Sequence, residues 1–350
     1  MKKFIFFILM LLPVTFLKFT SFGQNASYDL LTEPYVKRPV SMHLGQLEVV
    51  TAYNMSISGL YYEYDGNPTD IQENGTAVIG HRGFFKVRYG LLENIELAAE
   101  TNYFRQGMRS TTLNYNDPYE FVTISSLKEY RGLEDLLLSG TLRIPSTPGF
   151  FDFGLNAFLS LPLAKHNPDK PEHTVEYTFL DYWFTTINKK ETFRNGKGVI
   201  FYGLGAELKL HSEKLAVYGS ATCLAPVAEG TGLYWDSYLM DGIFHYNSVE
   251  YNYFPSSILK YHTEVHYQFN GWFNLFAGYS GMDENYGWFE RANLKFEYPR
   301  IKLSRLITGY EIQVSPAIRL VQILEFPLSG MNSYSSFTIH TGLNINMFTR

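Results

Sequence analysis

The chain has 350 residues, of which 17% are aromatic and only 18% are charged. The formal net charge of −5 gives no reason to expect a nucleic-acid partner, which would require a basic surface. A single cysteine, Cys223, excludes a framework of intramolecular disulfides. A chain that is rich in Tyr and Phe and poor in charge is typical of strands that alternate between lipid and water.

Residues 1–23 have the features of a secretory signal peptide. Two lysines precede an apolar run over residues 4–17, and small residues stand at the positions that a signal peptidase reads. We therefore expect export, with cleavage between Gly23 and Gln24. The run is too short for a membrane anchor, and no later segment has 18 consecutive apolar residues that would make a transmembrane helix.

Segments in which apolar and polar residues alternate recur along the rest of the chain. Each is about long enough to cross a bilayer as a tilted strand of roughly 9–11 residues. Residues 24–42 are predicted to be a periplasmic N-terminal segment, and residues 43–350 a single all-β domain. Twelve strands are predicted in it, at residues 43–57, 79–89, 95–106, 134–145, 151–163, 199–210, 215–227, 257–269, 273–282, 304–315, 318–328 and 336–348.

The connections between these strands alternate between short and long. Short ones with the composition of hairpin turns stand near residues 90–94, 146–149, 211–214, 270–271 and 315–317. The others are mostly long, at 58–78, 107–133, 164–198, 228–256 and 283–303, with a shorter one at 329–335. Bacterial outer-membrane barrels have short turns on one side and long loops on the other, whereas a β-sandwich gives no reason for such alternation.

The predicted fold is therefore a transmembrane up-and-down antiparallel β-barrel of 12 strands. The segment at 287–302 also alternates between apolar and polar residues. It could extend a strand above the membrane or add a hairpin, so 14 strands is the alternative.

The stretch KYHTEVHYQF, residues 260–269, shows the alternation clearly. In a bilayer every backbone N–H and C=O must be paired, so a sheet there closes on itself, with one face in lipid and one in the lumen. A charge on the lipid face at mid-bilayer costs roughly 2–4 kcal/mol, so we expect the charged positions to face inward. The alternation predicts these lumen-lining candidates: Lys86, Arg88, Glu96, Glu100, Glu207, Lys209, Lys260, His262, Glu264, His266, Gln268, Glu311 and His340.

His262, Glu264 and His266 are the weak candidates for a metal site. Successive members of one strand face are about 6.5–7 Å apart, and such a pair shares a metal only if a third ligand arrives from elsewhere. Only the distant His340 could supply it, so ordinary polar lining is the favoured interpretation and no metal or other cofactor is predicted. No Gly-x-Ser-x-Gly elbow occurs, so the protein is not predicted to be an enzyme.

The long connection at 228–256 is rich in aromatic residues. Exposed aromatics at this density could form a docking surface for an apolar or sugar ligand. The segment could equally fold inward or pack on its neighbours, and both interpretations stay open. The docking candidates are Tyr234, Trp235, Tyr238, Phe244 and Tyr246.

Three short motifs resemble a known family. RGLEDLLLSG at 131–140 looks like the Gly-x-x-Asp entry into a membrane strand in outer-membrane proteins of the MetA-pathway phenol-degradation family. LSLPL at 159–163 resembles that family's strand-end Leu-Pro element, and SGMN at 329–332 also fits. Glu134 stands where a glycine is common. The resemblance implies an outer-membrane channel for small, often aromatic or apolar, compounds, and it implies no particular binding residue.

We predict a passive outer-membrane channel or transport barrel for small molecules, apolar or aromatic ones among them. Its implied partners are outer-membrane lipid, the barrel-assembly machinery and a small solute. Two alternatives stay open: a non-conducting barrel that displays its aromatic loops for adhesion or assembly, and a barrel hydrolase that acts on lipid.

Overall fold

The computed structural model describes residues 33–71, 77–117, 120–145, 150–163, 169–179, 183–194, 197–240, 243–291 and 294–349. The predicted signal peptide and its cleavage site lie outside these ranges. Within them, no helix is long and apolar enough to cross a bilayer.

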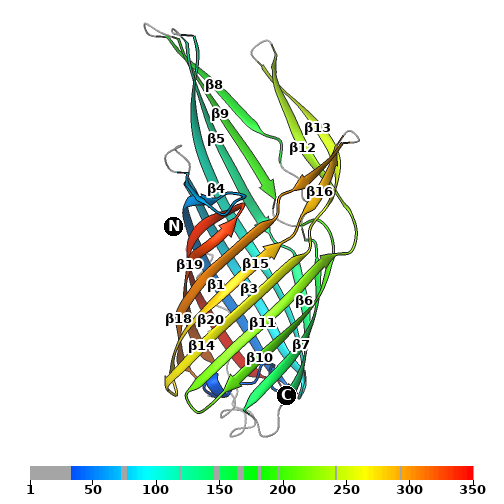
Figure 1. The fold of residues 1–350 in the computed structure, drawn as a ribbon, viewed down its shortest axis with the longest axis vertical. Helices are drawn as coiled ribbons and strands as arrows, with labels where there is room; N and C mark the ends of the chain where they lie inside the picture. Colours follow the sequence, from blue (N-terminus) through cyan, green and yellow to red (C-terminus); the bar gives the residue numbers. More distant parts are fainter. Residues whose placement is uncertain are drawn as a thin grey trace.

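Twelve long strands close into one antiparallel barrel (Figure 1). Strand β1 pairs with both β3 and β20, so the wall has no free edge. The predicted 12-stranded up-and-down barrel is confirmed, and each predicted strand overlaps one strand of the wall. In chain order the wall strands are β1 (Gln46–Tyr62), β3 (Ala77–Leu92), β4 (Ile95–Asp117), β6 (Leu136–Pro145), β7 (Phe151–Leu161), β10 (Phe201–His211), β11 (Leu215–Pro226), β14 (Ile258–Asn270), β15 (Phe273–Glu284), β18 (Ile301–Ser315), β19 (Ile318–Met331) and β20 (Ser333–Phe348).

The long connections build additional sheet above the barrel (Figure 1). One extension joins β4 to β5 (Glu120–Leu133), β9 (Trp183–Arg194) and β8 (Glu172–Phe179), and β5 pairs with β9 in parallel. A separate sheet contains β12 (Gly230–Met240), β13 (Ile243–Phe254), β16 (Gly287–Arg291) and β17 (Leu294–Tyr298), while the short β2 (Pro68–Asp70) pairs with β1. The alternative of 14 wall strands is not adopted, because β16 and β17 form a hairpin beside β13 and not in the wall.

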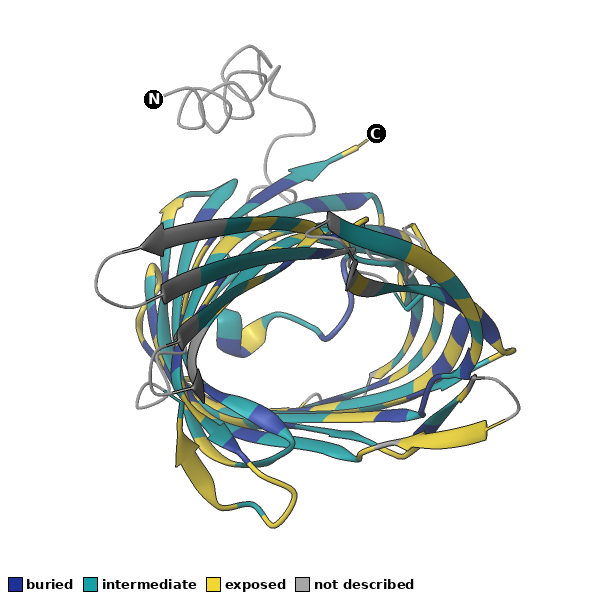
Figure 2. Ribbon diagram, turned by 90° about the horizontal axis from the view of Figure 1, so that it is seen from above, coloured by how far each residue is buried: buried dark blue, intermediate teal, exposed yellow. Residues whose placement is uncertain are grey.

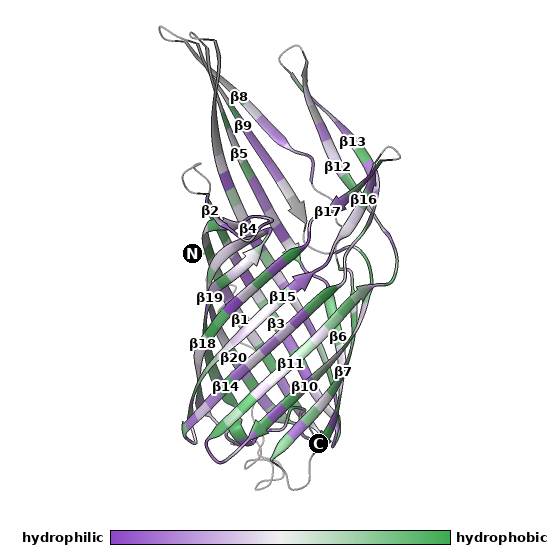
Figure 3. Cartoon of the chain, viewed as in Figure 1, coloured by the Kyte–Doolittle hydropathy of each residue, from purple (hydrophilic) through white to green (hydrophobic). Residues whose placement is uncertain are grey.

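Side chains alternate across the wall as period-two strands require. Figure 2 shows exposed and buried positions alternating along the strands, and Figure 3 shows hydrophobic bands on the barrel. On β14, Val265 is 48% exposed on the outer side, whereas the next residue, His266, is only 3% exposed on the inner side. Other exposed apolar residues of the outer face include Phe85, Leu97, Leu142, Leu155, Leu204, Val217 and Leu275.

The first described residues of the chain, 33–42, lie inside the barrel. The 3-10 helix η1 (Tyr35–Lys37) is seen within the ring of strands in Figure 2, at the end that carries the short turns in Figure 1. Of the segment 24–42, which the sequence predicts to be periplasmic, the described part, 33–42, lies within the barrel at its short-turn end. The physical reason is that its polar backbone and charged side chains find charged partners on the inner wall, as described below.

The outward orientation of β14 can be tested at Val265. We expect Val265→Lys to lower the free energy of unfolding in lipid vesicles by roughly 2–4 kcal/mol, because the ammonium would face acyl chains. The matched change Leu294→Lys, at a position that is 62% exposed on β17 outside the wall, should have little effect. Equal losses in the two variants, measured by urea titration, would contradict the assigned orientation.

Candidate functional site

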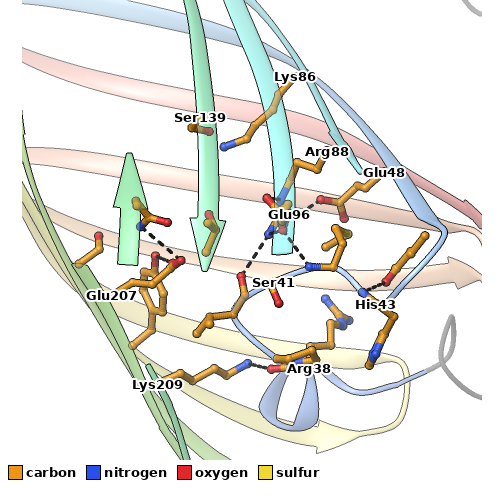
Figure 4. Close-up of a pocket in the computed structure, with 18 of the residues that line it drawn as sticks. Arg38, Ser41, His43, Glu48, Lys86, Arg88, Glu96, Ser139, Glu207 and Lys209 are labelled. Atoms are coloured by element: carbon orange, nitrogen blue, oxygen red, sulfur yellow. Dashed lines mark hydrogen bonds and ion pairs between the residues drawn. The ribbon is translucent and has the colours of Figure 1, made fainter. Parts of the chain in front are cut away.

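A cavity of about 380 Å³ lies in the lumen beside the N-terminal segment (Figure 4). We call residues 33–45 the insert and this space the lumen cavity. The insert forms part of the lining, and the inner faces of the wall strands supply the rest. The predicted lumen residues that line it are Lys86, Arg88, Glu96, Glu207, Lys209 and Glu311.

Two cations hold the first part of the insert. Arg38 Nη2 lies 2.6 Å from Glu311 Oε1 on β18. Lys209 Nζ on β10 donates to the carbonyl oxygen of Arg38 at 2.9 Å and to that of Tyr35. The same ammonium lies 4.0 Å from the centroid of the Tyr35 ring. Because Lys209 is only 2% exposed, its charge must be satisfied by protein groups, and the insert supplies them.

A second group of charges holds the later part of the insert (Figure 4). Arg88 donates to both carboxylate oxygens of Glu96, at 2.8 and 2.9 Å, and to Glu48 at 3.1 Å. Arg88 also donates to the carbonyl oxygen of Val40 at 3.3 Å, and the backbone N–H of Met42 donates to Glu96 at 2.8 Å. These charge-assisted bonds link two wall strands to the backbone of the insert.

The histidines of β14 form an internal network. Glu264 lies 3.0 Å from His262 Nε2 and 2.8 Å from His266 Nε2, and His266 Nδ1 lies 2.9 Å from the Asn274 amide. Tyr35 stacks on the His266 ring with centroids 3.7 Å apart, and burial raises the pKa of the Tyr35 phenol. Throughout the described ranges, no group of three or more His, Cys, Asp or Glu side chains is placed to hold a metal.

The remaining lumen candidates also lie on inward faces of their strands. Gln268 donates to the carbonyl oxygen of Asn270 at 2.6 Å, which ties it to the turn between β14 and β15. Lys260 is exposed. Their role in a solute path stays a prediction. The other pairs are Lys86 with Glu100 at 3.1 Å, His340 with Glu325 at 3.0 Å, and Glu207 with the Tyr218 hydroxyl at 2.8 Å.

The predicted docking aromatics lie on the β12–β13 hairpin and not on an irregular loop. The Tyr246 hydroxyl lies 2.8 Å from His173 Nδ1 on β8, and the Phe244 and His173 rings stack with centroids 4.1 Å apart. Burial, with the nearby Lys189, lowers the pKa of His173. Phe244 and Tyr246 thus join the two sheets above the barrel, whereas Tyr238 is 47% exposed. Tyr234 and Trp235 stand on β12, and a docking role for these five residues stays a prediction.

An apolar cluster lies above the polar part of the lumen. Phe201, Leu224 and Ile258, at the upper ends of wall strands, bury together with Val199 and with Tyr253 of β13. Phe158 of β7 packs against this cluster and also lines the lumen cavity. The cluster therefore fixes the sheet of β12, β13, β16 and β17 to the rim and places an aromatic ring beside the cavity.

Sequence reasoning missed the residues of the insert. Tyr35, Arg38 and Ser41 line the lumen cavity, but they lie in a segment with no strand periodicity that could have indicated their position. Arg319 was also missed, although it is 2% exposed on the inner face of β19 and 3.9 Å from Glu48. A charge on a strand with few other charged residues was the one signal for it in the sequence.

No protein-family model and no curated protein matches the chain. Among solved structures, an outer membrane channel from Pseudomonas putida F1 aligns with a TM-score of 0.59 at 13% identity, over 88% of this chain and 97% of that chain. The toluene transporter TbuX of Ralstonia pickettii gives 0.44 at 9% identity, over 88% and 90%. The P. putida toluene transporter TodX gives 0.43 at 10%, over 93% and 95%. The first similarity supports the same barrel fold, and the other two are too distant to add to it. The phenol-degradation family stays a resemblance.

The hold of Lys209 on the insert can be tested by thiol labelling. In a Cys223→Ser background, Ser41→Cys places a thiol at a position that is 1% exposed. Lys209→Met removes both hydrogen bonds to the insert while keeping the side-chain length, so an impermeant thiol reagent should react at least about tenfold faster. The control is Lys302→Met, which loses a 3.8 Å contact with Asp283 far along the chain from the insert. An unchanged labelling rate in the Lys209 variant would contradict the assigned role.

Proposed function

We propose that the protein is a passive channel of the bacterial outer membrane for small molecules, closed at its short-turn end by the insert. The observation that carries this proposal is a closed wall around a polar cavity of about 380 Å³, with the chain's own N-terminal segment seated in the lumen. A barrel that served only as an anchor would not need a polar lumen closed by buried ion pairs, because a lumen filled by apolar packing is often equally stable.

The contacts between the insert and the inner wall of the barrel include favourable and unfavourable ones. The Arg38–Glu311 pair and the two Lys209 hydrogen bonds favour the seated state. Against them, Ser41 Oγ is buried and finds no partner among the described residues. Such an orphaned group costs about 1–3 kcal/mol, which water would recover if the insert left. The balance supports a removable closure and not a permanent one.

The location and the solute class belong to the same proposal. An exposed apolar outer face requires surrounding lipid, and such a barrel would reach the outer membrane through a signal peptide and the barrel-assembly machinery. The fold shared with an outer membrane channel of P. putida F1 is in keeping with a transport role. Small molecules with apolar or aromatic parts would meet Phe158 beside the lumen cavity. A catalytic role is not part of the proposal.

The closure can be tested by charge reversal at its central ion pair. Arg38→Glu and Glu311→Arg each place like charges together at a contact of 2.6 Å, where breaking a buried pair costs about 3–5 kcal/mol. We expect either variant to raise the ionic current of the barrel in planar bilayers several-fold. The double variant Arg38→Glu/Glu311→Arg restores opposite charges and should return the current towards that of the unmodified protein.

Arg300→Glu serves as the control, since Arg300 pairs with Asp283 outside the insert seat. This change should leave the current unaltered. Absence of current in all variants would instead favour the non-conducting barrel. Currents that rise equally in the single and double variants would show that the Arg38–Glu311 pair does not hold the closure.

A further inference from the structure

The inner wall of the barrel has a charged half and a neutral half. The charged half lies on β1, β3, β4, β14 and β18 to β20. The neutral half lies on β6, β7, β10 and β11, above the level of Glu207. The charged half contains the pairs Arg82–Glu134, Lys86–Glu100, Arg88–Glu96 and Arg305–Glu325.

Two cross-strand rows make up the neutral half. Within each row the residues are register partners on neighbouring strands, so their side chains stand about 4.5–5.5 Å apart on one face. We call these two rows the neutral wall. The upper row is Ser139, Phe158, Gly203 and Leu224, and the lower row is Thr141, Asn156, Gly205 and Thr222.

The neutral wall presents hydroxyls, an amide and an aromatic ring to one space. Ser139, Thr141, Asn156, Phe158 and Thr222 all line the lumen cavity, and Figure 4 shows Ser139 beside it. Each hydroxyl can donate one hydrogen bond and accept two. The Asn156 amide donates to Glu207 at 3.4 Å, while its Oδ1 finds no partner among the described residues.

Glycine shapes the centre of the wall. A Cβ atom at Gly205 would stand 3.0 Å from Phe158 Cε2 and 2.9 Å from the Thr222 hydroxyl. The ring and the hydroxyl can therefore lie close to the β10 backbone only because these positions carry no side chain. The result is a shallow surface on which a flat molecule could rest, at one side of a cavity whose volume suits a small ligand.

We propose that the neutral wall is a binding site for an uncharged ring compound that carries several hydroxyl groups. This inference rests on the proposed channel function and names its solute class. A charged solute would lose water over the middle of this wall. The nearest charges stand at its edges, because Glu96 is in register with Thr141, Lys260 is in register with Thr222, and Glu207 accepts from Asn156. A purely apolar one would leave the wall's hydroxyls unpaired. A hydroxylated ring satisfies both conditions, because its hydroxyls meet Thr141 and Thr222 while its apolar face contacts Phe158.

Calorimetry on the purified barrel in detergent tests this without requiring conduction. The probes are glucose, resorcinol, the charged sugar acid gluconate, and benzene. We expect glucose or resorcinol to bind at least about tenfold more tightly than gluconate or benzene. Preference between the first two identifies the source of the ring as a sugar or an aromatic diol, and either result supports the site. Equal binding of all four probes, or binding of none, overturns it.

Paired hydroxyl deletions locate the site. Thr141→Val with Thr222→Val keeps the shape of both side chains and should weaken binding about tenfold. Thr263→Val, on the outer face of β14, is the matched control and should leave binding unchanged. An undiminished affinity in the double variant would sink the inference.

The Arg38→Glu barrel separates this inference from the proposed function. Addition of the bound probe should reduce its ionic current in planar bilayers, and the threonine pair should remove that block. A current that the bound probe does not reduce overturns the site as part of the path. Absence of current overturns the channel, while the calorimetric result still decides the binding site.

Discussion

Closure of the sheet is the constraint on which the rest of the structure depends. A bilayer offers no water to backbone N–H and C=O groups, so the pairing of β1 with both β3 and β20 removes the last free edge. Once the wall is closed, each strand has one dry and one wet face. Charge must then gather in the lumen, and the sheet extensions above the barrel, which stand outside lipid, are released from this alternation.

This constraint explains why the wall could be predicted and the remainder could not. Period-two alternation is enforced by lipid at every wall strand, so the inward and outward faces of β14 were readable from KYHTEVHYQF alone. Above the membrane no such force acts on the sequence. The pairing of β5 with β9 in parallel depends on contacts between separate connections, and nothing in either segment specifies its partner.

For the candidate site, the sequence indicated which way side chains point but not what they meet. His262, Glu264 and His266 were placed inward, yet their partner Tyr35 arrives from a segment more than 200 residues earlier. The Arg38–Glu311 pair spans 273 residues. The neutral wall was missed for another reason, because small polar residues such as Ser139 and Thr141 give a weak hydropathy signal and attract no attention as candidates.

The manner in which the insert is held bears on what it can do. An added strand would be fixed by a ladder of backbone bonds, which opens only when many break together. The insert instead offers isolated carbonyl and N–H groups to Lys209, Arg88 and Glu96. Water can replace these contacts one at a time, because every released group is itself well hydrated. A short 3-10 turn seated by charges is therefore suited to leave a lumen whose wall stays intact.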